Sequence, residues 1–126
     1  MDLPRVRHWI DGAEYDSDHA DTFDSRNPEN DLSIAVVTKA TRQEVDAAVE
    51  SADTTHSSYS ATGPSAREQI LLRAADLLTQ RADSFRDLLI REIGSPVAKA
   101  NLEIAIATRI LKANASMARR MTGRTY

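Results

Sequence analysis

The chain has 126 residues, with 16 basic and 19 acidic side chains and a formal net charge of −3 at pH 7. No basic block stands out from this distribution, so the sequence argues against nucleic acid as a partner. The absence of cysteine excludes a disulfide framework, a thiolate metal site and a cysteine nucleophile among these residues.

The hydropathy pattern argues against a membrane protein. No stretch approaches the apolar length that a bilayer requires, and the first residues lack the apolar segment of a signal peptide. Aromatic residues make up only 5% of the chain, so Ala, Leu, Ile and Val must supply most of the core. We therefore expect a cytoplasmic polypeptide built mainly from closely packed helices.

The start of the chain alternates short apolar runs with turn residues. Residues 6–10 alternate apolar and polar side chains and lead into Asp11-Gly12, a pair that favours the backbone of a two-residue hairpin turn. Residues 13–16 would form the returning strand, and a polar loop over residues 16–21 would follow.

A turn and a further strand complete this region. Asn27-Pro28 predicts the turn, because proline moves the residue before it out of the helical region. Residues 32–37 contain β-branched side chains and predict a strand. Residues 1–40 are thus expected to form N-terminal strands and a hairpin, and residues 41–126 to be helical.

About four helices are predicted after residue 40. Thr41 and Glu44 match a capping box, in which each side chain bonds the other residue's free amide. Apolar residues recur at helical spacing from there to about Ala52. The pattern then weakens, and Gly63-Pro64 breaks it.

The remaining helices show similar signals. Ser65 and Glu68 match a second capping box, and Gly94 is well placed as the left-handed cap of a third helix. The last helix is expected from about Pro96, within its first turn, to about Met121. Its apolar residues occupy more than one face, which is typical of a helix enclosed in a larger structure.

A search for reactive groups finds no self-contained active site. His8, His19 and His56 are far apart, which favours surface or packing roles over metal binding. Asp83 and Asp87 are four residues apart, which fits a solvated helix face better than an acid–base pair.

The remaining candidates are equally weak. Gly94-Ser95 precedes a helix, but one glycine does not make a phosphate-binding loop, so a C-cap followed by an N-cap is the better interpretation. No serine lies in a nucleophile elbow or is tied by the sequence to a histidine and an acid.

The order of the segments is more specific than any one of them, and it resembles the N-terminal region of the aldehyde dehydrogenase superfamily. The resemblance extends from about Val6 to Tyr126. Residues 92–95 and 99–103 look most similar to members that oxidise aromatic aldehydes such as benzaldehyde, vanillin or salicylaldehyde. The segments that carry the family resemblance are residues 8–12, 27–28, 36–37, 45–49, 65–78, 91–96 and 120–123.

The resemblance implies an α/β fold of the aldehyde dehydrogenase type, of which this chain is the N-terminal segment. Residues 41–126 would form the helical part of the family's NAD(P)-binding domain, with the catalytic and oligomerisation regions absent. In the family, a cysteine thiolate attacks the aldehyde, hydride passes to a nicotinamide, and water assisted by a glutamate releases the acid.

None of that machinery can be assigned to a residue of this chain. We expect no catalytic, cofactor-binding or metal-binding residue here, because the family's cysteine, glutamate and dinucleotide-binding segments have no counterpart in the sequence. NAD or NADP is implied for the complete family member, with no cofactor bound by this chain alone. The implied partner is the remainder of a subunit, which in the family assembles into homo-oligomers.

The leading hypothesis is therefore a fragment of an aldehyde dehydrogenase that is inactive alone. One alternative is a chain of a split enzyme whose second chain supplies the catalytic groups. Another is a small helical interaction module unrelated to catalysis. The apolar last helix favours the first two, because uncovered apolar surface is unfavourable for an independent soluble module.

Overall fold

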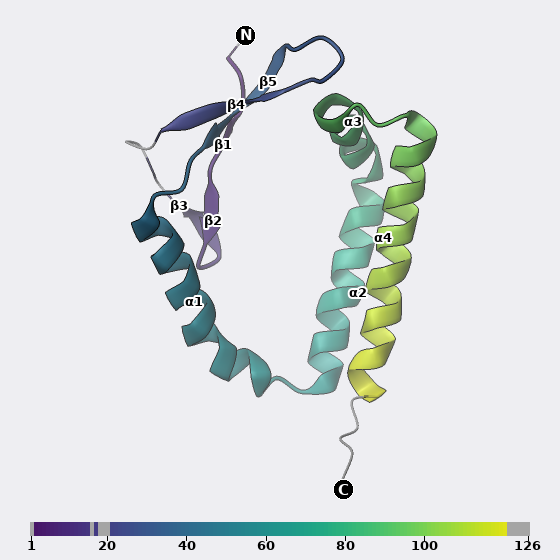
Figure 1. Cartoon of the computed structure of the whole chain (residues 1–126). Coiled ribbons are helices and arrows are strands. Elements are labelled where there is room, and N and C mark those ends of the chain that lie inside the picture. The colour runs from purple at the N-terminus through teal and green to yellow at the C-terminus, as the bar shows by residue number, and fades with distance from the viewer. Residues whose placement is uncertain (1, 16, 18–20, 121–126) are drawn as a thin grey trace, which may run out of the picture. The chain divides into compact units, whose positions relative to one another are not determined.

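The computed structural model describes residues 2–15, 17 and 21–120, which form two compact units, Met1–Ala61 and Thr62–Tyr126. The first unit contains five strands and one helix within its described residues, and the second contains the remaining helices (Figure 1). The polar loop expected over residues 16–21 lies largely outside the described residues, as does the predicted helix end near Met121.

The first unit contains a small mixed sheet in the order β1-β5-β4. β1 (Arg5–Val6) is parallel to β5 (Ser33–Thr38), and β4 (Thr22–Arg26) is antiparallel to it. The strand predicted over residues 32–37 is thus confirmed within one residue, whereas β4 was not predicted as a strand. The turn predicted at Asn27-Pro28 joins β4 to β5, where the Asn27 amide donates to the Leu32 carbonyl at 2.9 Å.

The predicted hairpin is confirmed. β2 (His8–Ile10) pairs antiparallel with β3 (Ala13–Tyr15), and Ile10 lies opposite Ala13. Between them Asp11 and Gly12 have φ values of 53° and 75°, the left-handed pair that a type I′ turn requires. Such a turn matches the natural twist of the two strands, which explains the preference for Asp-Gly at these positions.

Helix α1 (Arg42–Ser60) begins at the predicted capping box but continues past the predicted end at Ala52. Its last turns are rich in serine and threonine, which are weak helix formers because their hydroxyls compete for backbone groups. Here the hydroxyls bond carbonyls of the preceding turn instead: Ser58 to Thr55 and Ser60 to Ser57, both at 2.9 Å. The helix ends at Ser60, with Ala61 as its C-cap, shortly before Gly63-Pro64.

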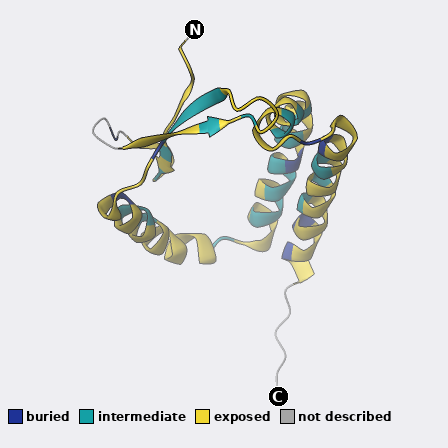
Figure 2. Ribbon diagram, turned by 45° about the horizontal axis from the view of Figure 1, so that its top comes forward, coloured by how far each residue is buried: buried dark blue, intermediate teal, exposed yellow. Residues whose placement is uncertain are grey.

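The second unit consists of α2 (Pro64–Gln80), α3 (Ala82–Ile93), α4 (Val97–Met117) and the 3₁₀ turn η1 (Ala118–Arg120). Helices α2 and α4 lie side by side along their length (Figures 1 and 2). Gly94 closes α3 with φ 64°, which confirms the predicted left-handed cap.

The second predicted capping box is wrong. Helix α2 begins at Pro64, with Gly63 as its N-cap and no side-chain cap, so Ser65 already lies inside the first turn. Proline at the first helical position has a preset φ and lacks the N–H that a cap would satisfy, and it sets the start ahead of Ser65. Glu68 instead pairs with Arg119 at 2.5 Å and so joins the first turns of α2 to η1.

The start of α4 also differs slightly from expectation. Pro96 has an extended ψ of 144° and serves as the N-cap, whereas the sequence placed it within the first turn. The described helix ends at Met117 and tightens into η1, so the 3₁₀ turn occupies part of the range predicted as helix.

The core of the second unit is made of alanines. Ala75 of α2 and Ala100 and Ala115 of α4 are fully buried, and Ala118 of η1 is nearly so. Among the described residues no large side chain is fully buried. We call the four residues Ala75, Ala100, Ala115 and Ala118 the alanine seam. Such small side chains allow two helices to approach closely, because interaxial distance depends on the residues at the contact.

The seam predicts a strong size limit at its fully buried positions. Ala100→Leu should destabilise the chain by about 1–3 kcal/mol, because three extra carbon atoms would enter a fully packed contact. Urea unfolding followed by far-UV circular dichroism measures this. The control is Ala105→Leu, at an exposed position of the same helix, which should have little effect. Equal effects of both variants would contradict a packed seam.

Candidate functional site

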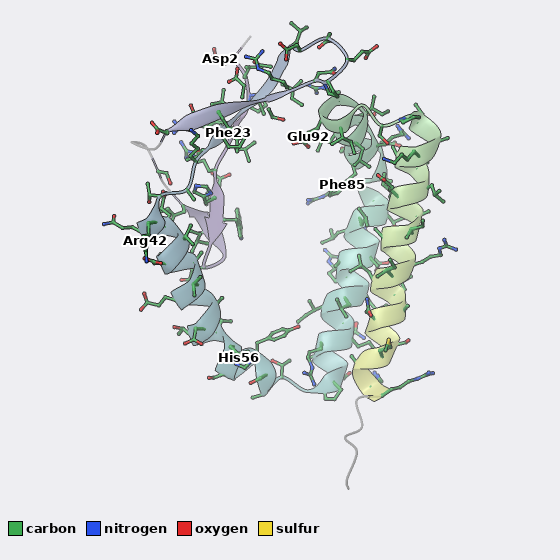
Figure 3. All side chains as sticks on the ribbon, in the orientation of Figure 1. Asp2, Phe23, Arg42, His56, Phe85 and Glu92 are labelled. Carbon is green, nitrogen blue, oxygen red and sulfur yellow. The ribbon has the colours of Figure 1, made fainter. Side chains whose placement is uncertain are left out.

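The titratable clusters do not form a metal centre. Among the described residues no group of three or more His, Cys, Asp or Glu side chains is placed to hold a metal ion. His8 lies on β2, His56 lies near the C-terminal end of α1 (Figure 3), and His19 lies outside the described residues.

The aspartate pair on α3 has a simple structural explanation. Arg86 contacts Asp83 at 2.8 Å and Asp87 at 3.7 Å, and both carboxylates are largely exposed. An arginine between two exposed carboxylates is a typical surface ion-pair arrangement of modest energy. This agrees with the solvated face that the sequence favoured.

Gly94-Ser95 likewise forms a helix connection. The Ser95 amide donates to the Leu89 carbonyl at 3.2 Å, which is part of the closing turn of α3. The Ser95 hydroxyl is buried and has no hydrogen-bond partner. Because it is not accessible from solution, it does not present a donor to an anion at the start of α4.

Within the described residues, the Glu44 carboxylate is the buried charged group of the first unit. It is buried and accepts hydrogen bonds from the Ser17 hydroxyl and, at 2.6 Å, from the Thr41 amide. The Thr41 hydroxyl in turn accepts from the Glu44 amide at 3.3 Å, which completes the capping box. Arg5 approaches the same place, donating to the Ser17 carbonyl at 3.4 Å.

These hydrogen bonds lower the pKa of Glu44. The largest cause is the bond from the Ser17 hydroxyl, followed by the Thr41 amide; burial acts in the opposite direction, and His8 contributes a small favourable charge interaction. Folding therefore favours the charged form of the Glu44 carboxyl group over the protonated form. The local role of this charge is to occupy the N-terminus of α1, where the helix dipole favours an anion.

Ser17, Glu44 and His8 resemble the residue types of a nucleophilic triad, but their connections differ. In a triad the histidine lies between the serine and the acid and removes the serine proton. Here Ser17 donates directly to Glu44, and the His8 Nε2 atom is buried without a hydrogen-bond partner. The cluster therefore stabilises structure and has no base positioned to activate Ser17.

Two concave surfaces lie between the hairpin and α1. The more apolar one has a volume of about 390 Å³, and Trp9, Val45 and Val49 are among the apolar side chains that line it. Trp9 is 70% exposed there. The second has a volume of about 570 Å³ and includes acidic groups at Asp11, Glu14 and Glu50. Neither contains an arrangement of nucleophile, base and oxyanion donor such as a catalytic site requires.

Sequence reasoning predicted no site residue, and it missed the Ser17–Glu44 contact. Glu44 was identified only as a helix cap. The Ser17 hydroxyl comes from 27 residues earlier in the chain, in a segment where no periodic pattern marks it. Only the folded arrangement of the first unit brings the two side chains together.

Comparison with known proteins defines the family. The sequence model of the aldehyde dehydrogenase family matches residues 15–126. Vanillin dehydrogenase of Corynebacterium glutamicum is 39% identical over 124 residues, which cover 97% of this chain and 25% of that protein. Succinate-semialdehyde dehydrogenase of Paenarthrobacter nicotinovorans is 37% identical over 79 residues, which cover 63% of this chain and 18% of that protein.

Comparison with solved structures supports the same family assignment. An NAD-dependent benzaldehyde dehydrogenase from Corynebacterium glutamicum superposes with a TM-score of 0.89 at 36% identity, covering 94% of this chain and 26% of that one. Lactaldehyde dehydrogenase from Escherichia coli has a TM-score of 0.93 at 20% identity, covering 97% and 26%, and supports the fold alone.

The chain belongs to the aldehyde dehydrogenase family and has the corresponding α/β fold. It spans about a quarter of the length of the relatives it matches, and it corresponds to their N-terminal quarter. The boundary between its two compact units falls after Ala61 because α1 packs with the hairpin. The assignment of residues 41–126 to the helical part of an NAD(P)-binding domain remains a prediction. Within the described residues, no helix is both long and apolar enough to cross a bilayer.

The lowered pKa of Glu44 predicts how the stability of the folded chain depends on pH. A carboxyl group whose pKa is depressed by folding stabilises the folded state above its unfolded pKa, near 4.5, and this contribution is lost as pH falls through the folded pKa. Glu44→Gln should therefore lower stability at pH 7 and flatten the loss of stability below pH 4.5. Urea unfolding at a series of pH values tests this.

The matched control is Glu50→Gln, on the same helix at an exposed position. It should leave the acid dependence unchanged. An identical pH profile for Glu44→Gln and the unmodified chain would contradict the role given to this carboxylate.

Proposed function

We propose that this chain forms the N-terminal part of an NAD(P)-dependent aldehyde dehydrogenase subunit, which oxidises an aldehyde to a carboxylic acid, and that it is inactive by itself. The observation that carries the proposal is the match of 97% of the chain to one quarter of vanillin dehydrogenase. The absence of cysteine from all 126 residues supports the proposed inactivity of the chain by itself, because the family's reaction requires a cysteine thiolate.

The connection between β5 and α1 supports the absence of dinucleotide binding by this chain alone. A strand followed by a helix is where many proteins bind a pyrophosphate, using a glycine-rich turn and the free amides of the helix N-terminus. Residues 39–41 contain no glycine, and the Glu44 carboxylate already accepts from the Thr41 amide. A fixed negative charge at this position would repel a phosphate.

For the complete enzyme we propose an aromatic aldehyde as substrate. The support is the identity of 39% to a vanillin dehydrogenase and of 36% to a benzaldehyde dehydrogenase, each over nearly the whole chain. The succinate-semialdehyde dehydrogenase reaches a similar identity over a shorter part of the chain and represents the competing, aliphatic assignment.

The isolated chain should neither oxidise aldehydes nor bind NAD or NADP at micromolar concentrations. Its residues supply no thiolate, and the β5–α1 connection offers no phosphate-binding turn. Aliphatic and aromatic aldehydes are assayed with both dinucleotides, and binding is measured by calorimetry. Turnover that persists through repurification and scales with the concentration of the chain would contradict the proposal.

A chimera tests the positive half of the proposal. This chain replaces the matched quarter of Corynebacterium glutamicum vanillin dehydrogenase, and the chimera should regain NAD-dependent oxidation of vanillin. The same protein without its first quarter is the control and should be inactive. A folded but inactive chimera would refute structural equivalence, and activity of the shortened control would show that this quarter is dispensable.

A further inference from the structure

Helix α4 has apolar side chains on two opposite faces. One face contains Ala100, Ala115 and the half-buried Ile104 and Leu111, and it packs in the second unit beside α2. The other contains four large side chains that are 38–60% exposed: Leu102, Ile106, Ile110 and Met117. We call this second set the outer stripe.

The outer stripe is a continuous line along the helix. Its members are spaced by four, four and seven residues, and Ala113 fills the gap between the last two. At 100° per residue this spacing keeps them on one face, about 140° from the face that packs beside α2. With a rise of 1.5 Å per residue, the stripe is about 22 Å long.

The composition of the outer stripe indicates what can cover it. Its side chains carry no hydrogen-bonding group other than the weak thioether of methionine, so a complementary surface must be apolar. Lys99 and Glu103, at one end, already pair with each other at 3.3 Å. A helix with two apolar faces is typical of an element between two layers of a larger fold.

We propose that the outer stripe is the surface through which this chain docks onto the remaining three quarters of an aldehyde dehydrogenase subunit. This inference rests on the proposed function. The helix lies within the part of the chain that matches relatives about four times as long, with 94% of the chain superposing on the benzaldehyde dehydrogenase. The partner of the stripe is therefore an apolar surface in the remaining three quarters of the same subunit.

The test uses the vanillin dehydrogenase chimera and two stripe variants, Ile106→Asp and Ile110→Asp. Each places a carboxylate where docking would bury it without a partner, so each should reduce NAD-dependent vanillin oxidation at least about tenfold. The matched control is Ala105→Asp, at an exposed position adjacent to Ile106 but off the stripe. This control should retain activity, even though Ala→Asp lowers the intrinsic helix propensity more than Ile→Asp does. Ile106→Leu should also retain it.

The isolated 126-residue chain provides a second measurement. There Ile110 is 53% exposed, so Ile110→Asp should leave helix content and the urea midpoint nearly unchanged. A loss of stability comparable to that of Ala100→Leu would place the stripe inside this chain's own core and overturn the inference.

The outcomes separate this inference from the proposed function. An active chimera whose stripe variants are as active as the Ala105→Asp control would overturn the docking surface and leave the proposed function intact. An inactive unmodified chimera would overturn both. Size-exclusion chromatography with light scattering shows whether the isolated chain is a dimer and whether Ile106→Asp makes it monomeric. If it does, and the Ile106→Asp chimera stays active, the stripe binds a second copy of the chain and the proposal is wrong.

Discussion

The close approach of α2 and α4 through the alanine seam is the constraint on which the second unit depends. Alanine side chains let the helix backbones approach closely, but each buries only one methyl group, worth about 0.8 kcal/mol on the scale of a buried CH₂ group. The seam thus fixes the geometry of the helix pair while providing little of the apolar burial that a stable domain needs. Larger side chains such as Leu102 and Ile110 remain about half exposed, which is the physical reason to regard the unit as part of a larger protein.

The first unit depends on a different interaction. Glu44 joins the N-terminus of α1 to Ser17, and the lowered pKa of its carboxyl group reflects these hydrogen bonds. The same charge fills the helix N-terminus that follows β5. This explains how a strand–helix connection in a dehydrogenase family can serve structure alone, and why we propose that cofactor binding requires other residues of a complete subunit.

Elements governed by local chemistry could be predicted from the sequence. Asp11-Gly12 specifies its turn through backbone preferences, Thr41 and Glu44 cap each other three residues apart, and Gly94 provides a left-handed cap. The wrong predictions of where α2 begins and where α1 ends also have local causes. Pro64 set the start of α2 ahead of the expected cap, and serine hydroxyls such as Ser58 bonded back to the helix and extended α1.

Long-range contacts could not be predicted in the same way. The Ser17–Glu44 and Glu68–Arg119 contacts join residues 27 and 51 positions apart, and no periodic pattern encodes such pairs. The apolar excess of α4 was visible in the sequence, but its division into a buried alanine face and an exposed face of larger residues required the structure. The family resemblance came from the order of many weak segments, and the comparisons confirmed it.

This chain alone buries less apolar surface than a packed domain of its length. Differential scanning calorimetry of the isolated chain tests it most directly. A packed domain of this length would absorb about 90 kcal/mol on unfolding near 60 °C, at about 0.7 kcal/mol per residue. We predict a broad transition with an enthalpy well below that value. A sharp two-state transition of a monomer with the full enthalpy would contradict the account.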